Sequence, residues 1–175
     1  MMNEFHPNLW APWRMEYIQS MTDESECFLC DYRDHPDSDT KNHVIWRTDD
    51  AFILLNRFPY TNGHLLIAAR EHKADLSDLS DIELTSLIRQ TRDAKRLLEE
   101  ALHPQGFNIG INFGRCAGAG LPGHLHVHIV PRWNGDTNFM AVLGDVRVIP
   151  QALEKLYGQL RATASKLGLP GDGET

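Results

Sequence analysis

The segment GHLHVHIVPRW, residues 123–133, places a histidine at every second position, and this alternation constrains the fold more than any other part of the chain. His124, His126 and His128 alternate with residues that favour strands, and Pro131 ends the run. Side chains two residues apart in a strand lie on the same face of the sheet. We therefore expect a β-strand with three imidazoles on one face and apolar side chains packed into the core on the other.

The rest of the chain predicts an antiparallel sheet around this strand. Residues 43–48, 51–56, 64–69 and 106–114 have the composition of four further strands, bounded by turn-forming residues such as Asn62-Gly63. The runs of strands are interrupted by one long helical segment rather than alternating regularly with helices. This order predicts an α+β fold.

Two helices are expected. Ser80 and Glu83 form a capping box that starts a long helix, and Pro104 closes it. A C-terminal helix is expected to start near Pro150. The residues expected to face the core are Ile82, Leu87, Ile88, Thr91, Ala94, Leu98 and Ala101 in the long helix, and Leu153, Leu156, Leu160 and Leu167 in the C-terminal helix.

The length of 175 residues suits one domain with arms at its ends. We expect an N-terminal arm at residues 1–39, the main domain at residues 40–135 and a C-terminal extension at residues 136–175. No apolar run approaches the roughly 18 residues of a membrane span, so no membrane partner is expected. The first residues do not resemble a signal peptide, and a cytoplasmic location follows as the default expectation.

The formal net charge of −7 argues against duplex nucleic acid as a partner, because such binding normally needs a basic face. A small phosphorylated ligand remains compatible with this charge, because it needs only local hydrogen-bond donors. The close pair Cys27 and Cys30 indicates a metal or redox site rather than a structural disulfide in a reducing compartment, whereas Cys116 stands alone.

Three histidines on one face suit two kinds of chemistry. They are either ligands of one metal ion or a nucleophile with two supporting residues. A strand rises about 3.3 Å per residue, so residues at positions i, i+2 and i+4 spread over roughly 13 Å, which is too far for three ligands of one ion. The nucleophile hypothesis therefore fits better.

The pattern HLHVHIV resembles the motif of the histidine-triad (HIT) superfamily, and the resemblance extends over LLNRFPYTNGHLLIAAREH and GFNIGINFGRCAGAG, from about Cys27 to Trp133. The segments LWAPWRMEYI and PRWNGDTNFM resemble the bacterial diadenosine tetraphosphate phosphorylases within that superfamily. The resemblance implies a HIT-like fold, a nucleotide substrate, and assembly as a homodimer or a larger homo-oligomer.

The resemblance also implies roles for single residues. His126 would attack the α-phosphorus and form a nucleotidyl-histidine, and His128 would donate to the phosphate oxygens. His124 would either support the nucleophile's ring or bind a metal. His64 resembles the additional histidine that packs beside the triad, and Asn56 stands where relatives contact the ribose hydroxyls.

The segment INFGRCAGAGLPGH resembles the phosphate loop of these relatives. Asn112 stands where they place an amide near the α- or β-phosphate, and Gly118 and Gly120 would let backbone N–H groups approach an anion. Gly120 and Leu121 occupy the positions where the hydrolase branch carries Gln and Ser or Thr. The side-chain contacts of the hydrolases to the leaving group must therefore be absent or replaced.

A zinc site is the second hypothesis drawn from the resemblance. Many superfamily members hold zinc with residues that match Cys27, Cys30, His72 and His124, a closed set of two thiolates and two imidazoles. The alternative is that the cysteines are ordinary residues of the arm and that His72 merely precedes the long helix.

Two classes of function remain open. The first is a nucleotidyl-transfer enzyme that splits diadenosine tetraphosphate with orthophosphate into ADP and ATP, or with water so that AMP is released. Arg115 or Arg132 would hold the orthophosphate, unless both are surface charges. The second is a nucleotide- or zinc-binding module that does not turn over. The intact middle histidine favours the enzyme.

Overall fold

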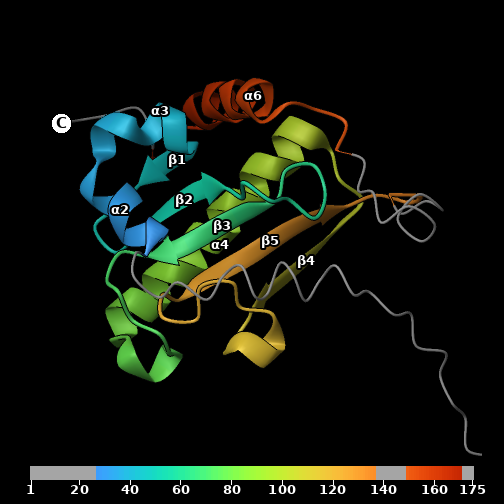
Figure 1. The fold of residues 1–175 in the computed structure, drawn as a ribbon. Helices are drawn as coiled ribbons and strands as arrows, with labels where there is room; N and C mark the ends of the chain where they lie inside the picture. The colour runs from blue at the N-terminus through green and yellow to red at the C-terminus, as the bar shows by residue number, and fades with distance from the viewer. Residues whose placement is uncertain (1–26, 137–148, 171–175) are drawn as a thin grey trace, which may run out of the picture.

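The computed structural model describes residues 27–136 and 149–170, arranged as one sheet with helices on both faces (Figure 1). The segment LWAPWRMEYI, the last residues of PRWNGDTNFM and the tail at 171–175 lie outside the described residues. The predicted division at residues 39 and 135 stays a prediction. Among the described residues, no helix combines the length and the apolar character needed to cross a bilayer.

The sheet has five strands in the order β1-β2-β3-β5-β4, and every neighbouring pair is antiparallel. This confirms the predicted α+β class. The histidine strand β5 lies between β3 and β4, where Ala68 pairs with His126 and Leu66 with His128. It begins at His126, so His124, which was expected on the same strand, lies in the turn before it. The strands are β1 (Val44–Arg47), β2 (Ala51–Leu55), β3 (Leu65–Ala69), β4 (Gly106–Ile111) and β5 (His126–Arg132).

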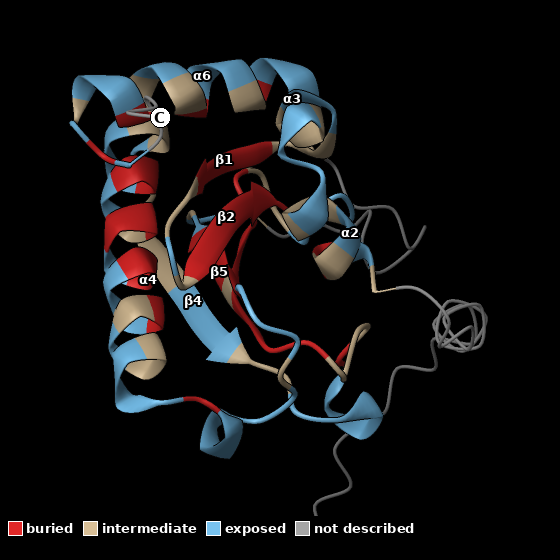
Figure 2. Cartoon of the chain, turned by 90° about the vertical axis from the view of Figure 1, so that its left-hand side faces the viewer, coloured by how far each residue is buried: buried red, intermediate tan, exposed pale blue. Residues whose placement is uncertain are grey.

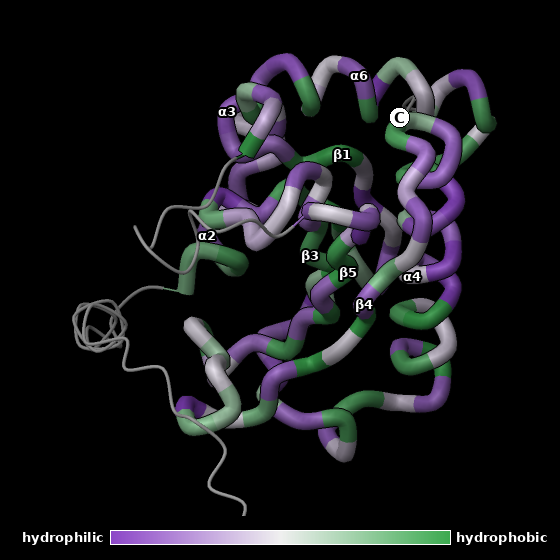
Figure 3. Tube along the Cα trace, turned by 90° about the vertical axis from the view of Figure 1, so that its right-hand side faces the viewer, coloured by the Kyte–Doolittle hydropathy of each residue, from purple (hydrophilic) through white to green (hydrophobic). Residues whose placement is uncertain are grey.

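Helix α4 (Asp81–Leu102) covers one face of the sheet. The predicted capping box is confirmed, since the Ser80 side chain accepts from the Glu83 N–H and the Glu83 carboxylate accepts from the Ser80 N–H. The helix ends at Leu102, two residues before Pro104. Figure 3 shows apolar positions along α4 beside the sheet. The buried residues of the helix belong to the main core, which includes Ile45, Ile53, Ile67, Val127, Ile129, Leu87, Ala94, Leu97 and Leu98.

The expected apolar face of α4 was wrong at two positions. Ile82 and Ile88 are 73% and 66% exposed, whereas Leu97, which the pattern missed, is fully buried. Each helical residue turns the chain by about 100°, so Ile88 lies about 100° and Ile82 about 140° around the helix from Leu87. Both side chains therefore point away from the sheet, although they are as apolar as their buried neighbours.

Helix α6 (Leu153–Lys166) confirms the C-terminal helix and packs against α4 and β1. Leu156 and Leu160 are buried, while Leu153 and Leu167 are partly buried against the same core. The Tyr157 hydroxyl donates to the Val44 carbonyl, so the helix also satisfies backbone groups of β1. One edge of the sheet is thus covered, whereas β4 at the other edge is largely exposed (Figure 2).

The opposite face of the sheet carries the short helix α2 (Phe28–Asp34) and a smaller apolar cluster. This cluster consists of Leu29, Val44, Phe52, Leu54, Leu66 and Ala68, with Cys27, Tyr32 and Leu121 packed against it. His126 and His128 lie on this face, because they pair with Ala68 and Leu66. The remaining short elements are α3 (Asp39–Asn42) and the 3-10 turns Pro36–Ser38, Leu76–Asp78 and Arg115–Ala117.

Candidate active site

His126 is held in one tautomer by a backbone group. Its Nδ1 donates to the carbonyl oxygen of His124 over 2.7 Å, and the residue is 7% exposed. A neutral imidazole carries one proton, so a proton on Nδ1 leaves the lone pair on Nε2. Burial lowers the pKa of His126, which keeps the ring neutral near pH 7. The ring therefore offers a nucleophilic nitrogen without a separate base.

His128 is held in the opposite tautomer by two hydrogen bonds in series. The Tyr60 backbone N–H donates to His64 Nδ1 over 3.1 Å, which places the proton of His64 on Nε2. His64 Nε2 then donates to His128 Nδ1 over 3.0 Å. The proton of His128 is therefore on Nε2, which is buried and has no hydrogen-bond partner among the described residues.

The two imidazoles lie side by side. The ring centroids of His126 and His128 are 4.9 Å apart, and Tyr60 stacks over His128 at 6.1 Å. Burial, and then the neighbouring His126, lowers the pKa of His128 to about 4, so this ring is also neutral near pH 7. The unprotonated Nε2 of His126 and the buried Nε2–H of His128 thus lie next to each other on one face of β5, as a nucleophile and a hydrogen-bond donor would.

Asn56 lies beside His64, and its expected contact with the ribose hydroxyls stays a prediction. Its Nδ2 is 3.3 Å from His64 Nδ1, and its Oδ1 accepts from the Phe58 backbone N–H over 2.9 Å. The loop with Asn56 and the strand with His64 are also joined by a backbone hydrogen bond from Asn56 to His64. The structure therefore brings Asn56 to the histidine cluster, with its oxygen engaged in a local turn.

The glycine loop before β5 differs from the expectation at Gly118. Its N–H donates to the Arg115 carbonyl, and its φ of 89° is in the left-handed region that favours glycine. Gly118 therefore shapes the turn, and its N–H is not available to an anion. Asn112 approaches the Gly118 carbonyl at 3.5 Å, so its amide lies against the same turn.

The two residues that distinguish this loop from the hydrolase pattern have no polar side-chain atoms. Gly120 follows the buried Ala119, and Leu121 packs against the apolar cluster under α2.

Arg132 does not supply a free guanidinium for an anion. It forms a two-point ion pair with Asp136 at 2.6 and 2.9 Å and donates to Asn108.

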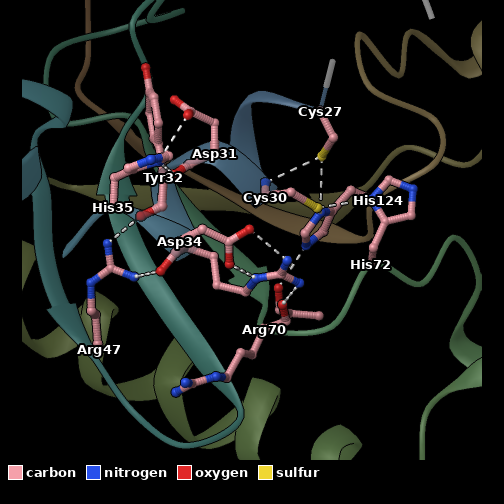
Figure 4. Close-up of polar contacts among 12 residues, drawn as sticks. Cys27, Cys30, Asp31, Tyr32, Asp34, His35, Arg47, Arg70, His72 and His124 are labelled. Atoms are coloured by element: carbon pink, nitrogen blue, oxygen red, sulfur yellow. Dashed lines mark hydrogen bonds and ion pairs between the residues drawn. The ribbon is translucent and has the colours of Figure 1, made fainter. Parts of the chain in front are cut away.

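A second cluster contains the four residues expected to bind zinc (Figure 4). The ligand atoms of Cys27, Cys30, His72 and His124 all lie within 4.8 Å of one another. Cys27 Sγ and Cys30 Sγ are 3.2 and 3.5 Å from His124 Nδ1, and Cys30 Sγ is 3.2 Å from His72 Nδ1. Usual zinc bond lengths and a tetrahedral angle give a sulfur–nitrogen separation of roughly 3.5 Å. The donor set fits a structural zinc ion.

The surroundings of this cluster orient its ligands. His124 is fully buried, and its Nε2 donates to the Ala69 carbonyl over 2.7 Å, which leaves Nδ1 for the metal. Burial raises the pKa of the Cys30 thiol to about 11, so binding of a metal ion would displace a proton there. The carbonyl of the same His124 orients His126, so the two clusters share one residue.

Sequence reasoning expects a backbone carbonyl at the second ring nitrogen of His126, but it does not identify which backbone groups set the tautomers. The Tyr60 amide, the Ala69 carbonyl and the His124 carbonyl are backbone groups, and any residue type provides them. No side-chain pattern distinguishes these positions. Their role follows only from the register of β3 and β5 and from the turn before β3.

Comparisons with known proteins give a consistent result. A family model described as "HIT domain" matches residues 37–135. A Mycobacterium tuberculosis protein named "AP-4-A phosphorylase" is 38% identical over 151 residues, covering 83% of this chain and 77% of that protein. A Schizosaccharomyces pombe protein named as an asymmetrical bis(5′-nucleosyl)-tetraphosphatase is 35% identical over 95 residues, covering 54% of this chain and 52% of that protein.

Among solved structures, a zinc-bound histidine triad family protein from Mycobacterium smegmatis superposes with a TM-score of 0.64 and 29% identity. The match covers 79% of this chain and 95% of that protein. The shared fold, together with the zinc named for that structure, agrees with the Cys27, Cys30, His72 and His124 set found here.

Proposed function

The chain belongs to the HIT domain family, and from this premise we propose that it is a phosphorylase that splits diadenosine tetraphosphate with orthophosphate into ADP and ATP. His126 takes up an adenylyl group in a first step that releases ATP. Orthophosphate then attacks the phosphorus of the intermediate, which releases ADP and restores the free imidazole. Both steps form one bond to phosphorus and break another, and no redox partner is needed.

The opposite tautomers of His126 and His128 are the observation that carries this proposal. The bare Nε2 of His126 attacks the α-phosphorus, and the His124 carbonyl stabilises the positive charge that develops on the ring. The Nε2–H of His128 donates to the phosphate oxygens and to the departing oxygen. Such a positioned donor accelerates related reactions by about 10²–10⁴-fold.

Zinc has a structural part in this proposal. Cys27, Cys30, His72 and His124 would hold it, and the ion would cross-link α2, the turn after β3 and the start of β5. The residues of this site keep His124 in position, and the His124 carbonyl accepts the hydrogen bond from Nδ1 of the nucleophile His126.

The choice of orthophosphate over water rests on similarity and on the loop. The M. tuberculosis relative is named a phosphorylase and matches a larger share of the chain than the S. pombe tetraphosphatase does. Gly120 and Leu121 also lack the side-chain donors of the hydrolase pattern. Because Arg132 is paired with Asp136 and the Gly118 N–H is bonded within the turn, we assign the orthophosphate to Gly120 of the glycine loop and to the side of Asn112.

Product analysis tests the function directly. The protein is incubated with diadenosine tetraphosphate, with and without orthophosphate, and the products are separated by chromatography. ADP plus ATP, formed only with orthophosphate, is the expected result. AMP plus ATP at millimolar orthophosphate would favour a hydrolase, and binding without products would favour a non-catalytic nucleotide-binding module.

We also propose assembly as a homodimer through the edge strand β4. Within residues 27–136 and 149–170 this strand pairs with β5 alone, and the apolar Ile109 on it and Phe113 just after it are 48% and 41% exposed. An open edge with exposed apolar side chains favours pairing with another strand. Sedimentation should give the mass of a dimer, and Ile109→Glu should give a monomer; a monomeric wild-type protein would refute the proposal.

A cytoplasmic location is proposed from the cysteine chemistry. Metal binding by Cys27 and Cys30 requires reduced thiols, which cytoplasmic conditions maintain. Fractionation of cells that express the natural protein would test this, and recovery from an oxidising compartment would contradict it.

A further inference from the structure

A chain of three amide side chains joins the turn before His64 to the C-terminal helix. Asn62 Nδ2 donates to Gln151 Oε1 over 3.2 Å, and Gln151 Nε2 donates to Gln159 Oε1 over 3.0 Å. Gln159 Nε2 then donates to the Ala101 carbonyl near the end of α4 over 2.7 Å. Residues far apart in the sequence are thus connected to the turn before His64 by three amide side chains and one backbone carbonyl.

The carbonyl at the end of this chain fixes the direction of every amide in it. A carbonyl only accepts, so Gln159 must present its NH₂ group to Ala101 and its oxygen to Gln151. The same reasoning orients Gln151 and then Asn62, whose NH₂ group must face Gln151. Asn62 Oδ1 is thereby turned away, and it is buried without a hydrogen-bond partner among the described residues. An amide flip at Asn62 would place two oxygens against each other.

The turn that holds Asn62 has little freedom to adjust. Gly63 has a φ of 79°, and a Cβ atom there would lie 2.5 Å from the Leu102 Cδ1 atom of α4. The Thr61 hydroxyl donates to the Pro131 carbonyl on β5 over 2.9 Å. Both neighbours of Asn62 are therefore fixed against the sheet and α4, and the His64 N–H donates to the Thr61 carbonyl of the same turn over 3.4 Å.

The position of His64 affects His128, the hydrogen-bond donor of the active site. Its Nε2 donates to His128 Nδ1, and this bond is what places the proton of His128 on Nε2. His126 is held instead by the His124 carbonyl, which is not part of the turn. The amide chain therefore reaches the donor and not the nucleophile.

We propose that Asn62, Gln151 and Gln159 are positioning residues that hold His64 and, through it, the donor tautomer of His128. The C-terminal helix is then part of the active-site scaffold rather than only a cover for β1. The kinetic consequence rests on the proposed function, whereas the effect on the histidine protons does not.

Imidazole N–H resonances test the proposal without substrate. In the wild-type protein, the hydrogen-bonded Nε2–H of His64 should be visible by NMR, and the ¹⁵N shifts should report a single Nε2–H tautomer for His128. In Gln151→Ala, the His64 proton should be lost to exchange with water and His128 should become a mixture of tautomers. The Nδ1–H of His126 should be unchanged, which makes it an internal reference.

A matched variant separates positioning from helix docking. Lys166→Ala removes the 3.0 Å ion pair between Lys166 and Glu100, another polar link between α6 and α4, and leaves the amide chain intact. It should keep the wild-type resonances and activity. Gln151→Glu still accepts from Asn62 but cannot donate to Gln159, so it should shift both readouts less than Gln151→Ala does.

The expected kinetic effect of Gln151→Ala is a roughly tenfold lower kcat with an unchanged KM, a part of the 10²–10⁴-fold that a positioned donor contributes. Gln159→Ala, at an exposed position, should shift both readouts in the same direction by less, and it serves if Gln151→Ala does not fold. The proposal is refuted if Gln151→Ala matches Lys166→Ala in both readouts, or if Gln151→Glu is affected as strongly as Gln151→Ala. A wild-type protein without turnover but with the expected resonances would refute the proposed function alone.

Discussion

His126 begins strand β5 and His124 lies two residues before it, yet they belong to clusters of different chemistry. Around His124, two thiols and a second imidazole converge, and the remaining ring nitrogen donates to the Ala69 carbonyl. Around His126 and His128 the polar groups include another imidazole, the Asn56 amide and backbone groups, and the arrangement leaves one unprotonated nitrogen on His126 and one buried N–H on His128. The alternation in the sequence places the rings on one face, and their neighbours decide what each ring does.

The two clusters also differ in how they should respond to change. The catalytic cluster depends on the tautomer of single rings, so the loss of one ring removes one chemical step. The Cys/His cluster, defined by Cys27, Cys30, His72 and His124, acts through position, so the loss of one ligand should affect folding first. They meet at His124, whose carbonyl holds His126.

Removal of the nucleophile should have the largest effect on turnover. His126→Ala should lower turnover by on the order of 10³-fold or more, because the covalent step is lost. Nucleotide binding, measured by calorimetry, should persist because the pocket remains. A variant that retains a tenth or more of the wild-type rate would rule out His126 as the nucleophile.

Removal of the donor should have the next largest effect. His128→Ala should lower kcat by about 10²–10⁴-fold, the contribution of one positioned proton donor, while the protein still binds nucleotide. Steady-state kinetics with diadenosine tetraphosphate measure this. If His128→Ala were nearly as active as the wild type, the assignment of its Nε2–H to the phosphate would be wrong.

Loss of a zinc ligand should affect metal binding and stability more than catalysis, which distinguishes the two clusters. The wild-type protein should carry about one zinc per chain by elemental mass spectrometry, and Cys30→Ser should lower both the zinc content and the Tm. Its kcat should fall less than that of His126→Ala. Cys116→Ser is the matched control, since Cys116 is exposed and outside the cluster. Metal-free protein of full stability would contradict a structural role for zinc.

The smallest expected effect is the pH dependence of the free energy of unfolding. Burial lowers the pKa of His128 from 6.5 to about 4, so the unfolded chain binds a proton more readily than the folded one. The contribution of neutral His128 to stability is present above pH 6.5 and is lost as the pH falls from 6.5 to about 4. Chemical denaturation across this range should show the loss, and His128→Asn should show less of it. If the free energy of unfolding depended on pH equally in both proteins, the burial of His128 would be contradicted.

The sequence predicted the parts of the molecule that depend on side-chain type. Alternation placed His126 and His128 on one face, and the capping box placed the start of α4 at Ser80. The four residues of the Cys/His cluster followed from the family resemblance, and the structure brings them together.

Other features depend on the three-dimensional arrangement and could not be predicted. Ile82 and Ile88 are exposed because helix geometry, and not apolar character, decides which side faces the sheet. Arg132 is neutralised by Asp136, a partner on the loop after β5. The tautomers of the catalytic rings depend on backbone groups that any sequence would supply.

The central claim is that the bare Nε2 of His126 forms the covalent bond to phosphorus. Mass spectrometry of the protein after incubation with diadenosine tetraphosphate, without orthophosphate, tests it most directly. We predict one adenylyl group on His126, which orthophosphate discharges as ADP. An adenylyl group on His128 or His124, or turnover with no adduct on any histidine, would contradict the account.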